Sequence, residues 1–442
     1  MTLSTLEKLE NKTATIGVIG LGYVGLPIVK AYTKLGMKVI GFDVSQNRIE
    51  ELKLGKSPIR AVSNETLEEI ITNKLFLPTQ DFSNIAECTA LIICVPTPLD
   101  KYSQPDLSYV ENSTKTIAKF IKKGQIISLE STTYPGTTEE IVLPILEATG
   151  LSAGKDYFLV YSPERENPGE GGHSVETIPK VVSGYTEHCL KAGIQLYKLI
   201  VEKVVTASST KVAEMVKLLE NIYRAVNISM VNEMKMIADQ MGIDIHEVID
   251  AASTKPFGFT PFYPSPGIGG HCIPVDPFYL TYKAKEFGIH TRFIELAGEI
   301  NYKVQRFVVN KTISALNNVT KSLNRSKVLI VGIAYKKNVE DMRESPSIHI
   351  AQMLAERGAI VDYYDPLILE LKPYWSKAMF NIDHKASIKS LENIKDYDIV
   401  ILHTDHDGID YNYILENSQL LVDTRGKYRD VPVMYKEKLT YA

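Results

Sequence analysis

The chain lacks several features that would each indicate a class of protein. It has 442 residues and a formal net charge of −4, so it has no basic excess for binding nucleic acid through bulk charge. No apolar run approaches the roughly 20 residues that span a bilayer. Residues 1–13 are polar, with no signal-peptide core. We therefore expect no nucleic-acid partner, no membrane association and no secretory signal.

Cysteine is also scarce, with only Cys88, Cys94, Cys189 and Cys272 present. None of them form a CxxC pair, and a chain of this length buries a sizeable core without disulfides. We expect free thiols in a cytoplasmic protein, three of them as small buried apolar residues. The same scarcity argues against a metal site, because no matched CxxC or HxxxH spacing supplies a set of ligands.

Apolar β-rich runs alternate with helical stretches at both ends of the chain. Strands that are apolar throughout and separated by helices are typical of a parallel sheet covered on both faces. We see no sequence repeat. The expected strands are residues 15–19, 38–42, 91–95, 126–129, 327–331, 360–363, 398–402 and 420–423, and the expected helices include residues 24–35, 107–121, 137–148 and 347–357.

The middle of the chain is helical. Residues 209–241 contain no Gly or Pro and carry apolar residues at helical spacing, which predicts one long helix ended by Gly242. A shorter helix at 246–253 and a Gly/Pro-rich loop at 255–277 follow, and long irregular loops are usually functional. The predicted fold class is α/β, with two Rossmann-like doubly wound domains joined by a helical region with one long central helix. We place the domains at residues 1–205, 206–310 and 311–442.

The first motif is a glycine turn in which Gly20, Gly22 and Gly25 have GxGxxG spacing after a strand and before a helix. Such glycines allow a tight turn, close approach of a pyrophosphate and close packing of the helix on the sheet. Asp43 ends the next strand, where an acid binds the adenosine ribose and favours NAD over NADP. A glycine-rich turn without a ligand is the alternative. Arg48 could flank the adenine or be a solvated helix residue.

The second motif places Cys272 among glycines in PSPGIGGHCIPVDP at residues 264–277. Bulky side chains are absent, so we expect accessible backbone amides and a close approach of ligand. A buried structural cysteine would normally lie in an apolar strand or helix, as Cys94 does. A reactive thiol is therefore the favoured interpretation, and a metal site that uses His271 and Cys272 is the rival. Asp276 follows the thiol by four residues.

A polar stripe on the long helix is the third feature. Glu214, Lys217, Asn221 and Arg224 are spaced by three, four and three residues, so they share one face. Polar groups on a helix that is otherwise packed must be satisfied, either by a ligand or in a solvated groove. A lysine beside a thiol would favour the thiolate form.

Basic residues follow the first strand of the C-terminal part, in YKK at 335–337 and DMRESPS at 341–347. A Ser/Pro helix start with nearby Lys and Arg suits a second phosphate-bearing ligand. An ordinary loop with surface charge is the alternative. Arg425, after the last strand, could likewise contact such a ligand or be an ordinary surface charge.

Together these motifs resemble the nucleotide-sugar 6-dehydrogenase family, typified by UDP-glucose dehydrogenase, over nearly the whole chain. The resemblance lies in seven ordered motifs, which makes it highly specific. They are GxGYVGLP at 20–27, CVPTP at 94–98, ESTTYPGTT at 130–138, SPER at 162–165, KxxEN at 217–221, GGHC at 269–272 and KKNVEDMRES at 336–345.

The resemblance implies an NAD domain and a UDP-binding domain joined by a helical region, with the long helix central to a homodimer or larger homo-oligomer. It also implies a four-electron oxidation by two NAD in succession. The C6 alcohol of a UDP-sugar becomes an aldehyde, Cys272 adds to it as a thiohemiacetal, a second oxidation gives a thioester, and water releases the carboxylate.

The family's residue roles carry over to matching positions. Lys217 and Asn221 would stabilise oxyanion intermediates, whereas Glu164, Thr132 and Asp276 would position water and assist proton transfer. With Cys272 these six form the expected catalytic set. The expected cofactor contacts are Gly20, Gly22, Tyr23, Val24, Gly25, Asp43, Arg48, Pro96, Thr97, Thr132 and Arg343. The expected substrate contacts are Glu164, Arg165, Lys217, Asn221, Arg224, Tyr263, Gly269, Lys336 and Arg425.

The same motifs also bear on the substrate. Arg165 after Glu164, and His271 before Cys272, resemble the branch of the family that oxidises UDP-N-acetylhexosamines, and Arg165 could hydrogen-bond an acetamido carbonyl. Residues 99–110 and the SPERENPG run at 162–169 are more similar to the UDP-N-acetylglucosamine enzymes. UDP-glucose and UDP-N-acetylmannosamine are the alternative substrates. A 2-hydroxyacid or 6-phosphogluconate-type dehydrogenase would not need Cys272, and a non-catalytic nucleotide-sugar binder would not keep both the thiol and Lys217.

Overall fold

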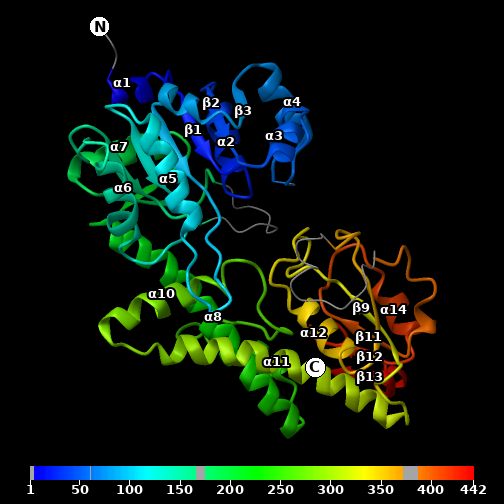
Figure 1. Cartoon of the computed structure of the whole chain (residues 1–442). Helices are drawn as coiled ribbons and strands as arrows, with labels where there is room; N and C mark the ends of the chain where they lie inside the picture. The colour runs from blue at the N-terminus through cyan, green and yellow to red at the C-terminus, as the bar shows by residue number, and fades with distance from the viewer. Residues whose placement is uncertain (1–3, 60, 166–174, 372–386) are drawn as a thin grey trace. The chain divides into compact units, whose positions relative to one another are not determined.

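The computed structural model describes residues 4–59, 61–165, 175–371 and 387–442 (Figure 1). The chain divides into two compact units. Unit 1 comprises Met1–Glu220 and Phe278–Ile289, and unit 2 comprises Asn221–Pro277 and His290–Ala442. Each unit is built around its own sheet and has its own core.

The sheet of unit 1 has the strand order β3-β2-β1-β4-β5-β6-β7-β8. All neighbouring strands are parallel except β6 and β7, which are antiparallel. Most of the strand residues are buried, as expected where helices cover both faces. The strands are β1 (Ile16–Ile19), β2 (Val39–Phe42), β3 (Phe76–Thr79), β4 (Ala90–Ile93), β5 (Ile126–Leu129), β6 (Phe158–Tyr161), β7 (Lys180–Gly184) and β8 (Val204–Thr206).

Helices pack on both faces of this sheet and form two apolar clusters. The helix expected at 137–148 is instead a π-helical turn, Thr138–Val142, followed by the short helix α6 (Leu143–Glu147). The other helices are α1 (Thr5–Glu10), α2 (Gly25–Lys34), α3 (Gln46–Lys53), α4 (Asn64–Thr72), α5 (Ser108–Phe120), α7 (Glu187–Tyr197) and α10 (Asp276–Ala284), with 3-10 turns at Phe82–Glu87 and Lys285–Phe287.

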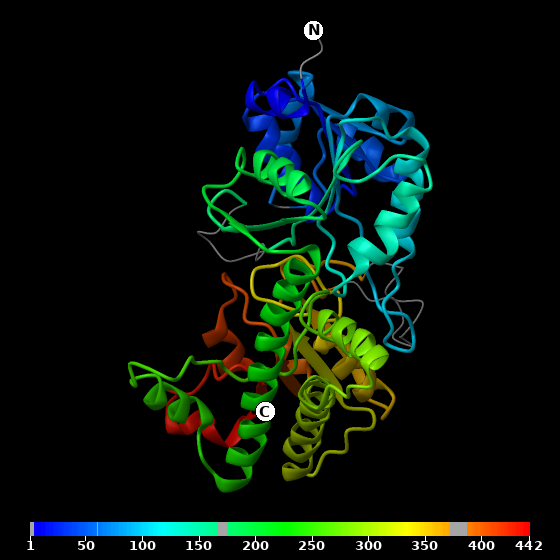
Figure 2. The same ribbon diagram turned by 90° about the vertical axis from the view of Figure 1, so that its left-hand side faces the viewer.

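The middle of the chain is mainly helical. The long helix α8 (Thr210–Met241) matches the predicted range and ends before Gly242, which has φ +70°. The short helix α9 (Ile245–Ala252) follows. A second long helix, α11 (Arg292–Asn318), lies beside the C-terminal half of α8, and the Ser229 hydroxyl donates to the Ala297 carbonyl at 2.9 Å (Figure 2).

The sheet of unit 2 is parallel throughout, in the order β10-β9-β11-β12-β13. Its strands are β9 (Lys327–Val331), β10 (Ile360–Tyr364), β11 (Ile399–Leu402), β12 (Leu421–Asp423) and β13 (Leu439–Tyr441). The helices α12 (Pro346–Ala355) and α14 (Tyr411–Asn417) flank it, with 3-10 turns at Ile394–Asp396 and Val433–Lys438. Two Rossmann-like sheets and a helical region confirm the predicted fold class.

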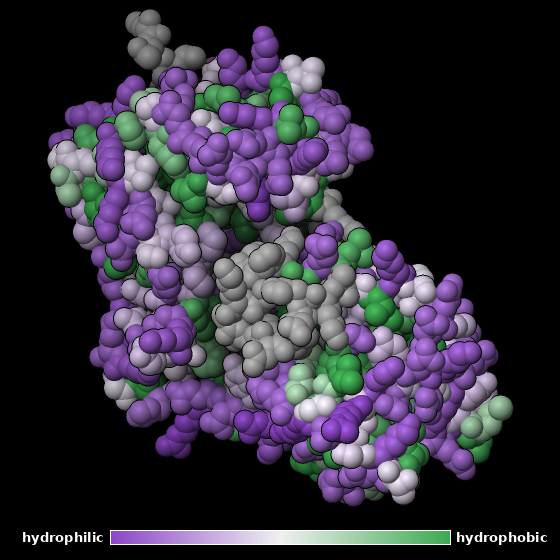
Figure 3. All heavy atoms as spheres, turned by 45° about the vertical axis from the view of Figure 1, so that its right-hand side comes forward, coloured by the Kyte–Doolittle hydropathy of each residue, from purple (hydrophilic) through white to green (hydrophobic). Residues whose placement is uncertain are grey.

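One face of the molecule is mainly polar. In the view of Figure 3 hydrophilic side chains dominate, and hydrophobic ones are scattered among them. No helix in the described ranges is both long enough and apolar enough to cross a membrane.

Candidate active site

The glycine turn of unit 1 lies between β1 and α2. Gly20 has φ +94°, and a Cβ atom there would come within 2.5 Å of the Cys94 carbonyl oxygen. Gly25 opens α2 and packs against the backbone of Gly20. A Cβ atom at Gly22 would meet nothing within 4 Å, so the backbone faces open space there. A bound pyrophosphate could therefore approach this turn closely, so the turn fits NAD.

Asp43 follows β2 at the carboxyl edge of the same sheet. Its Oδ2 accepts the Leu21 N–H at 3.1 Å, and its Oδ1 accepts the Ser45 N–H at 2.9 Å. The Arg48 guanidinium donates to the Leu21 carbonyl at 2.9 Å. Arg48 therefore braces the glycine turn, and the interpretation of it as a merely solvated residue is wrong. The contact joins residues 27 positions apart, so the local sequence carries no signal of it.

The loops after β4 and β5 lie at this edge too, because β1, β4 and β5 are neighbours. Pro96 is exposed, and Thr97 and Thr132 are half-buried. The Thr97 carbonyl accepts the hydroxyl of Tyr279, and Ser131 joins the two loops by donating to the Val95 carbonyl at 2.7 Å. These residues thus follow strands next to the glycine turn, where open α/β sheets bind their ligands.

Glu214 has a purely protein environment. Its carboxylate accepts the Gly136 N–H at 2.6 Å, the Thr138 N–H at 2.9 Å and the Thr138 hydroxyl at 2.7 Å. Burial raises the pKa of Glu214 to about 7, and the hydrogen bonds from Gly136 and Thr138 act in the opposite direction. Neither a ligand nor a solvated groove satisfies this part of the stripe. Instead, Glu214 anchors the segment that carries Thr132.

Lys217 is buried one turn further along α8, with its side chain 4% exposed. Its ammonium lies 3.6 Å from the Glu164 carboxylate. The neighbouring Arg165 binds both carboxylate oxygens of Glu220, at 2.6 and 3.3 Å, and the Pro179 carbonyl at 2.6 Å. Unit 1 therefore brings together the SPER motif and the first half of the α8 stripe.

The second half of the stripe lies in unit 2 and meets the cysteine loop. Asn221 is fully buried, and its amide donates to the Asp276 carboxylate at 2.5 Å. Arg224 in turn donates to the Asn221 side-chain oxygen. The Cys272 carbonyl accepts the N–H groups of Val275 and Asp276 at 3.1 and 2.8 Å. Cys272, Asp276 and Asn221 are therefore linked by consecutive hydrogen bonds.

Cys272 itself is half-buried, and its Sγ lies 3.4 Å from Nε2 of His271. In the part of the chain that the structure describes, no three His, Cys, Asp or Glu side chains converge in a way that could hold a metal ion. The thiol thus has an imidazole neighbour but no ligand set around it.

The glycines of this loop also have a packing role. A Cβ atom at Gly269 would lie 2.7 Å from the Tyr335 Cβ and 2.9 Å from the Glu344 carbonyl oxygen. Gly270 has φ +84°, and its N–H donates to the Arg343 carbonyl at 3.0 Å. The glycines therefore let the loop pack directly on residues 335–346. The sequence gives no sign of this packing.

The basic side chains of unit 2 have protein partners as well. Arg343 binds the Asp341 carboxylate at 2.6 Å, Arg425 donates to the His403 carbonyl at 2.6 Å, and Lys336 is half-buried. Burial lowers the pKa of Arg425. The Tyr263 hydroxyl donates to Asp250 at 2.9 Å.

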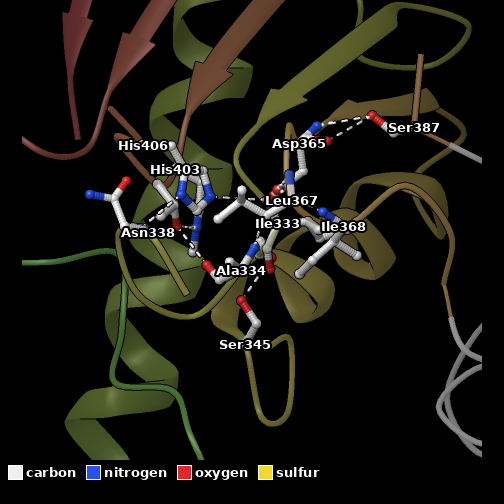
Figure 4. Close-up of polar contacts among 12 residues, drawn as sticks. Ile333, Ala334, Asn338, Ser345, Asp365, Leu367, Ile368, Ser387, His403 and His406 are labelled. Carbon is white, nitrogen blue, oxygen red and sulfur yellow. Dashed lines mark hydrogen bonds and ion pairs between the residues drawn. The ribbon is translucent and has the colours of Figure 1, made fainter. Parts of the chain in front are cut away.

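Sequence reasoning missed a buried pair of polar side chains in unit 2. Asp365 follows β10 and His406 follows β11, and their side chains meet at 3.2 Å with exposures of 0% and 1% (Figure 4). Its one sequence signal is an acid after the second strand of a Rossmann-like sheet, the same signal that identified Asp43.

The chain matches three consecutive domains of the UDP-glucose/GDP-mannose dehydrogenase family. The NAD binding domain matches residues 14–201, the central domain residues 211–303 and the UDP binding domain residues 329–430. The expected family is thereby confirmed.

Individual relatives span most of the chain. UDP-N-acetyl-D-glucosamine 6-dehydrogenase of Pseudomonas aeruginosa is 40% identical, covering 81% of this chain and 84% of that protein. UDP-N-acetyl-D-mannosamine dehydrogenase of Methanococcus maripaludis is 34% identical, covering 89% and 86%. The solved structure of the UDP-D-ManNAc dehydrogenase from Pyrococcus horikoshii has a TM-score of 0.86 at 29% identity, covering 95% and 97%. The chain therefore belongs to the UDP-glucose/GDP-mannose dehydrogenase family and is an NAD-dependent oxidoreductase.

Proposed function

We propose that the protein oxidises the C6 alcohol of a UDP-N-acetylhexosamine, UDP-N-acetylglucosamine in particular, to the carboxylate. The observation that carries the proposal is the placement of Cys272. It is half-buried in a glycine loop, and its carbonyl accepts the N–H of Asp276, whose carboxylate accepts the Asn221 amide. A cysteine whose backbone is tied to a residue that binds a buried amide suits covalent catalysis on a carbonyl group.

The proposed reaction has four steps: an oxidation, addition of the thiolate, a second oxidation and a hydrolysis. NAD, when bound, accepts the hydride from C6 in each oxidation. The alcohol loses a hydride and a proton to give an aldehyde, and the Cys272 thiolate adds to it as a thiohemiacetal. Loss of a second hydride gives a thioester, and water cleaves the C–S bond to release the acid and regenerate the thiol. One sugar thus consumes two NAD and one water.

Each residue group has a proposed task. Lys217 supplies a buried positive charge, and Asn221 supplies an amide donor, for the oxyanions that form at C6. Glu164, Thr132 and Asp276 position water or transfer protons. For the cofactor, the glycine turn holds the pyrophosphate, Asp43 the ribose and Arg343 a further contact. The proposed contacts to the UDP-sugar beyond these are Arg165, Arg224, Tyr263, Gly269, Lys336 and Arg425.

The acetamido preference is proposed to depend on Arg165. Its contacts with Glu220 and Pro179 occupy three of the five guanidinium N–H groups. Within the part of the chain that the structure describes, two N–H groups therefore remain for an acetamido carbonyl. The relatives named for N-acetylglucosamine and N-acetylmannosamine derivatives are 40% and 34% identical to this chain. Both sugars, together with UDP-glucose, therefore belong in the test.

The decisive experiment measures NADH per mole of limiting sugar for four UDP-sugars, those of N-acetylglucosamine, N-acetylgalactosamine, N-acetylmannosamine and glucose. We expect about two NADH per acetamido sugar. The Cys272→Ala variant should lose this yield. Cys88→Ala is the matched control, because burial raises the pKa of the Cys88 thiol to about 12 and keeps it protonated. Two NADH from UDP-glucose alone would end the acetamido assignment. One NADH per sugar would end the thioester mechanism.

We also propose a cytoplasmic homodimer formed through α8, within the three domains 1–205, 206–310 and 311–442. None of the four cysteines is in a disulfide, which suits a reducing compartment. An apolar stripe with 42–65% exposure runs along α8, at Met215, Leu219, Tyr223, Met230, Met234, Ile237 and Met241. Exposed stripes of this kind mark interaction sites.

Light scattering of the purified chain tests the dimer. The wild type should have twice the monomer mass, and Met230→Glu should reduce it. Val205→Glu, at an exposed apolar residue in β8, is the control and should leave the mass unchanged. A monomeric wild type would contradict the proposal.

A further inference from the structure

The turn that carries Lys336 is held from one side by the turn after β11. Asn338 has φ +59°, a left-handed conformation that Asn tolerates better than most residues. Its side-chain amide donates to the Asp407 carboxylate at 2.6 Å, and its side-chain oxygen accepts the Asp407 N–H at 2.9 Å. Its own backbone N–H donates to Nδ1 of His406 at 2.9 Å (Figure 4). Three hydrogen bonds therefore fix the backbone two residues after Lys336.

These contacts determine the tautomer of His406. A backbone N–H can only donate, so Nδ1 must be the unprotonated acceptor. Nε2 then carries the hydrogen and donates it to Asp365 Oδ2 at 3.2 Å. The imidazole thus bridges a donor on one side and an acceptor on the other, and only its neutral form fits both.

Asp365, which accepts the hydrogen bond from His406, is itself held firmly in place. Its Oδ2 accepts the N–H groups of Ile333 and Ala334 at 2.7 and 3.0 Å, and its Oδ1 accepts those of Leu367 and Ile368 at 2.8 and 3.0 Å. Including His406, the carboxylate therefore accepts five donors while fully buried. A group satisfied in this way moves little, so the imidazole has a fixed position.

We infer that His406 is a positioning residue for the UDP-sugar site, which holds the turn of Lys336 in its binding conformation through the hydrogen bond to Asn338. The inference rests on the proposed function, in which Lys336 contacts the substrate. His406 acts through that turn and does not touch the substrate. The bound conformation is then set before substrate arrives, and the benefit is in affinity.

The other end of the segment that carries Lys336 is held by contacts that do not involve His406. The Tyr335 N–H donates to the Asp341 carbonyl at 3.0 Å, and Arg343 pairs with Asp341 at 2.6 Å. The contact from Gly270 to the Arg343 carbonyl lies at this end. Loss of His406 should therefore affect binding of the UDP-sugar and leave the cysteine loop and its chemistry in place.

Two variants separate the bonds of the imidazole. His406→Asn keeps a side-chain oxygen near the Nδ1 position, and His406→Gln reaches toward Asp365 but offers no acceptor at that position. We expect His406→Gln to raise the Kd of UDP and the KM of the UDP-sugar about tenfold, with kcat and the KM of NAD within about twofold. His406→Asn should stay within about threefold of wild type, and the exposed His290→Asn should be unchanged.

A double-mutant cycle with Lys336→Met tests whether His406 acts through Lys336. If it does, the double variant should bind UDP no more weakly than Lys336→Met alone. Three outcomes would each overturn the inference. The losses of UDP affinity could be additive in the double variant, or the UDP affinity of His406→Gln could be unchanged. The third outcome is an equal loss of affinity in the Asn and Gln variants that follows their melting temperatures. UDP binding is measured by calorimetry, without turnover. A wild type that binds no UDP would defeat the proposed function together with the inference, whereas a wild type that binds UDP isolates the inference.

Discussion

The turns after β1 in unit 1 and after β9 in unit 2 have the same backbone design. Gly20 and Gly332 have φ +94° and +83°, and their N–H groups donate to the last residue of the adjacent strand, Phe42 or Tyr364, at 2.8 Å in each case. The next N–H in each turn donates to the acid after that strand, Asp43 or Asp365. Each unit therefore begins its sheet with the same glycine turn and acid.

The two turns differ in what surrounds that shared design. Gly22 faces open space and α2 begins at Gly25, whereas Ala334 is fully buried and α12 begins only at Pro346. Asp43 is half-buried, but Asp365 is fully buried and saturated by five donors. Unit 1 therefore keeps an open turn, a helix N-terminus and an accessible acid for a dinucleotide. Unit 2 uses the equivalent acid as internal support for an inserted segment that carries Lys336 and Arg343.

The largest effect should come from the feature that the turns share. Gly20→Ala and Gly332→Ala each place a Cβ atom at positive φ against a carbonyl oxygen, that of Cys94 or Thr404. Strain and clash together should cost about 3 kcal/mol in each variant. Urea unfolding measures this loss. A loss in only one of the two variants would show that the turns are not equivalent.

Replacing the acids should separate the units. Asp365→Asn puts an amide where backbone N–H groups need an acceptor, and it should lower the free energy of unfolding by about 2–4 kcal/mol. Asp43→Asn should cost under about 1 kcal/mol but raise the Kd of NAD about tenfold. Urea unfolding and NAD calorimetry on both variants measure the contrast. An Asp365→Asn chain as stable as wild type would break the comparison.

The second glycine sharpens the contrast at a smaller scale. Gly22→Ala adds a methyl group where the cofactor should approach, so the Kd of NAD should rise about fivefold to tenfold with stability changed by less than about 0.5 kcal/mol. Ala334→Gly in unit 2 should leave the Kd of NAD unchanged. Isothermal calorimetry of NAD binding decides, and equal affinities of Gly22→Ala and wild type would place the cofactor elsewhere.

The sequence predicted those parts of the molecule that local pattern controls. The apolar strands, the glycine turn with Asp43 and the range of α8 all follow from periodicity or spacing. The relation between the two turns was missed, because GLGY at 20–23 and GIAY at 332–335 share only Gly and Tyr, and the following segments differ in length. Similar backbone geometry does not require similar side chains where the neighbouring structure differs.

The unpredicted parts of the site depend on contacts between distant residues. Glu214 meets Gly136 and Thr138 across more than 70 positions, and Asp365 meets His406 across 41. The pattern placed Glu214 correctly on a polar helix face, but it could not say whether protein or ligand satisfies that face. A pairing of this kind is determined by how the strands assemble, which no local window contains.

The smallest expected effect is on how the stability of the protein depends on pH in acid. Burial raises the pKa of Asp365, but the hydrogen bond from His406 and those from the backbone N–H groups of Leu367 and Ala334 outweigh it, so the pKa lies below its usual value. The unfolded chain therefore takes up this proton first as the pH falls, and stability present above roughly pH 4 is lost below it. Melting temperatures from roughly pH 6 to pH 3 should fall less steeply in Asp365→Asn than in wild type, with Asp43→Asn as control. Parallel curves would mean that the carboxylate of Asp365 gains no more in the folded state than in the unfolded one, and its role as a saturated support in unit 2 would fail.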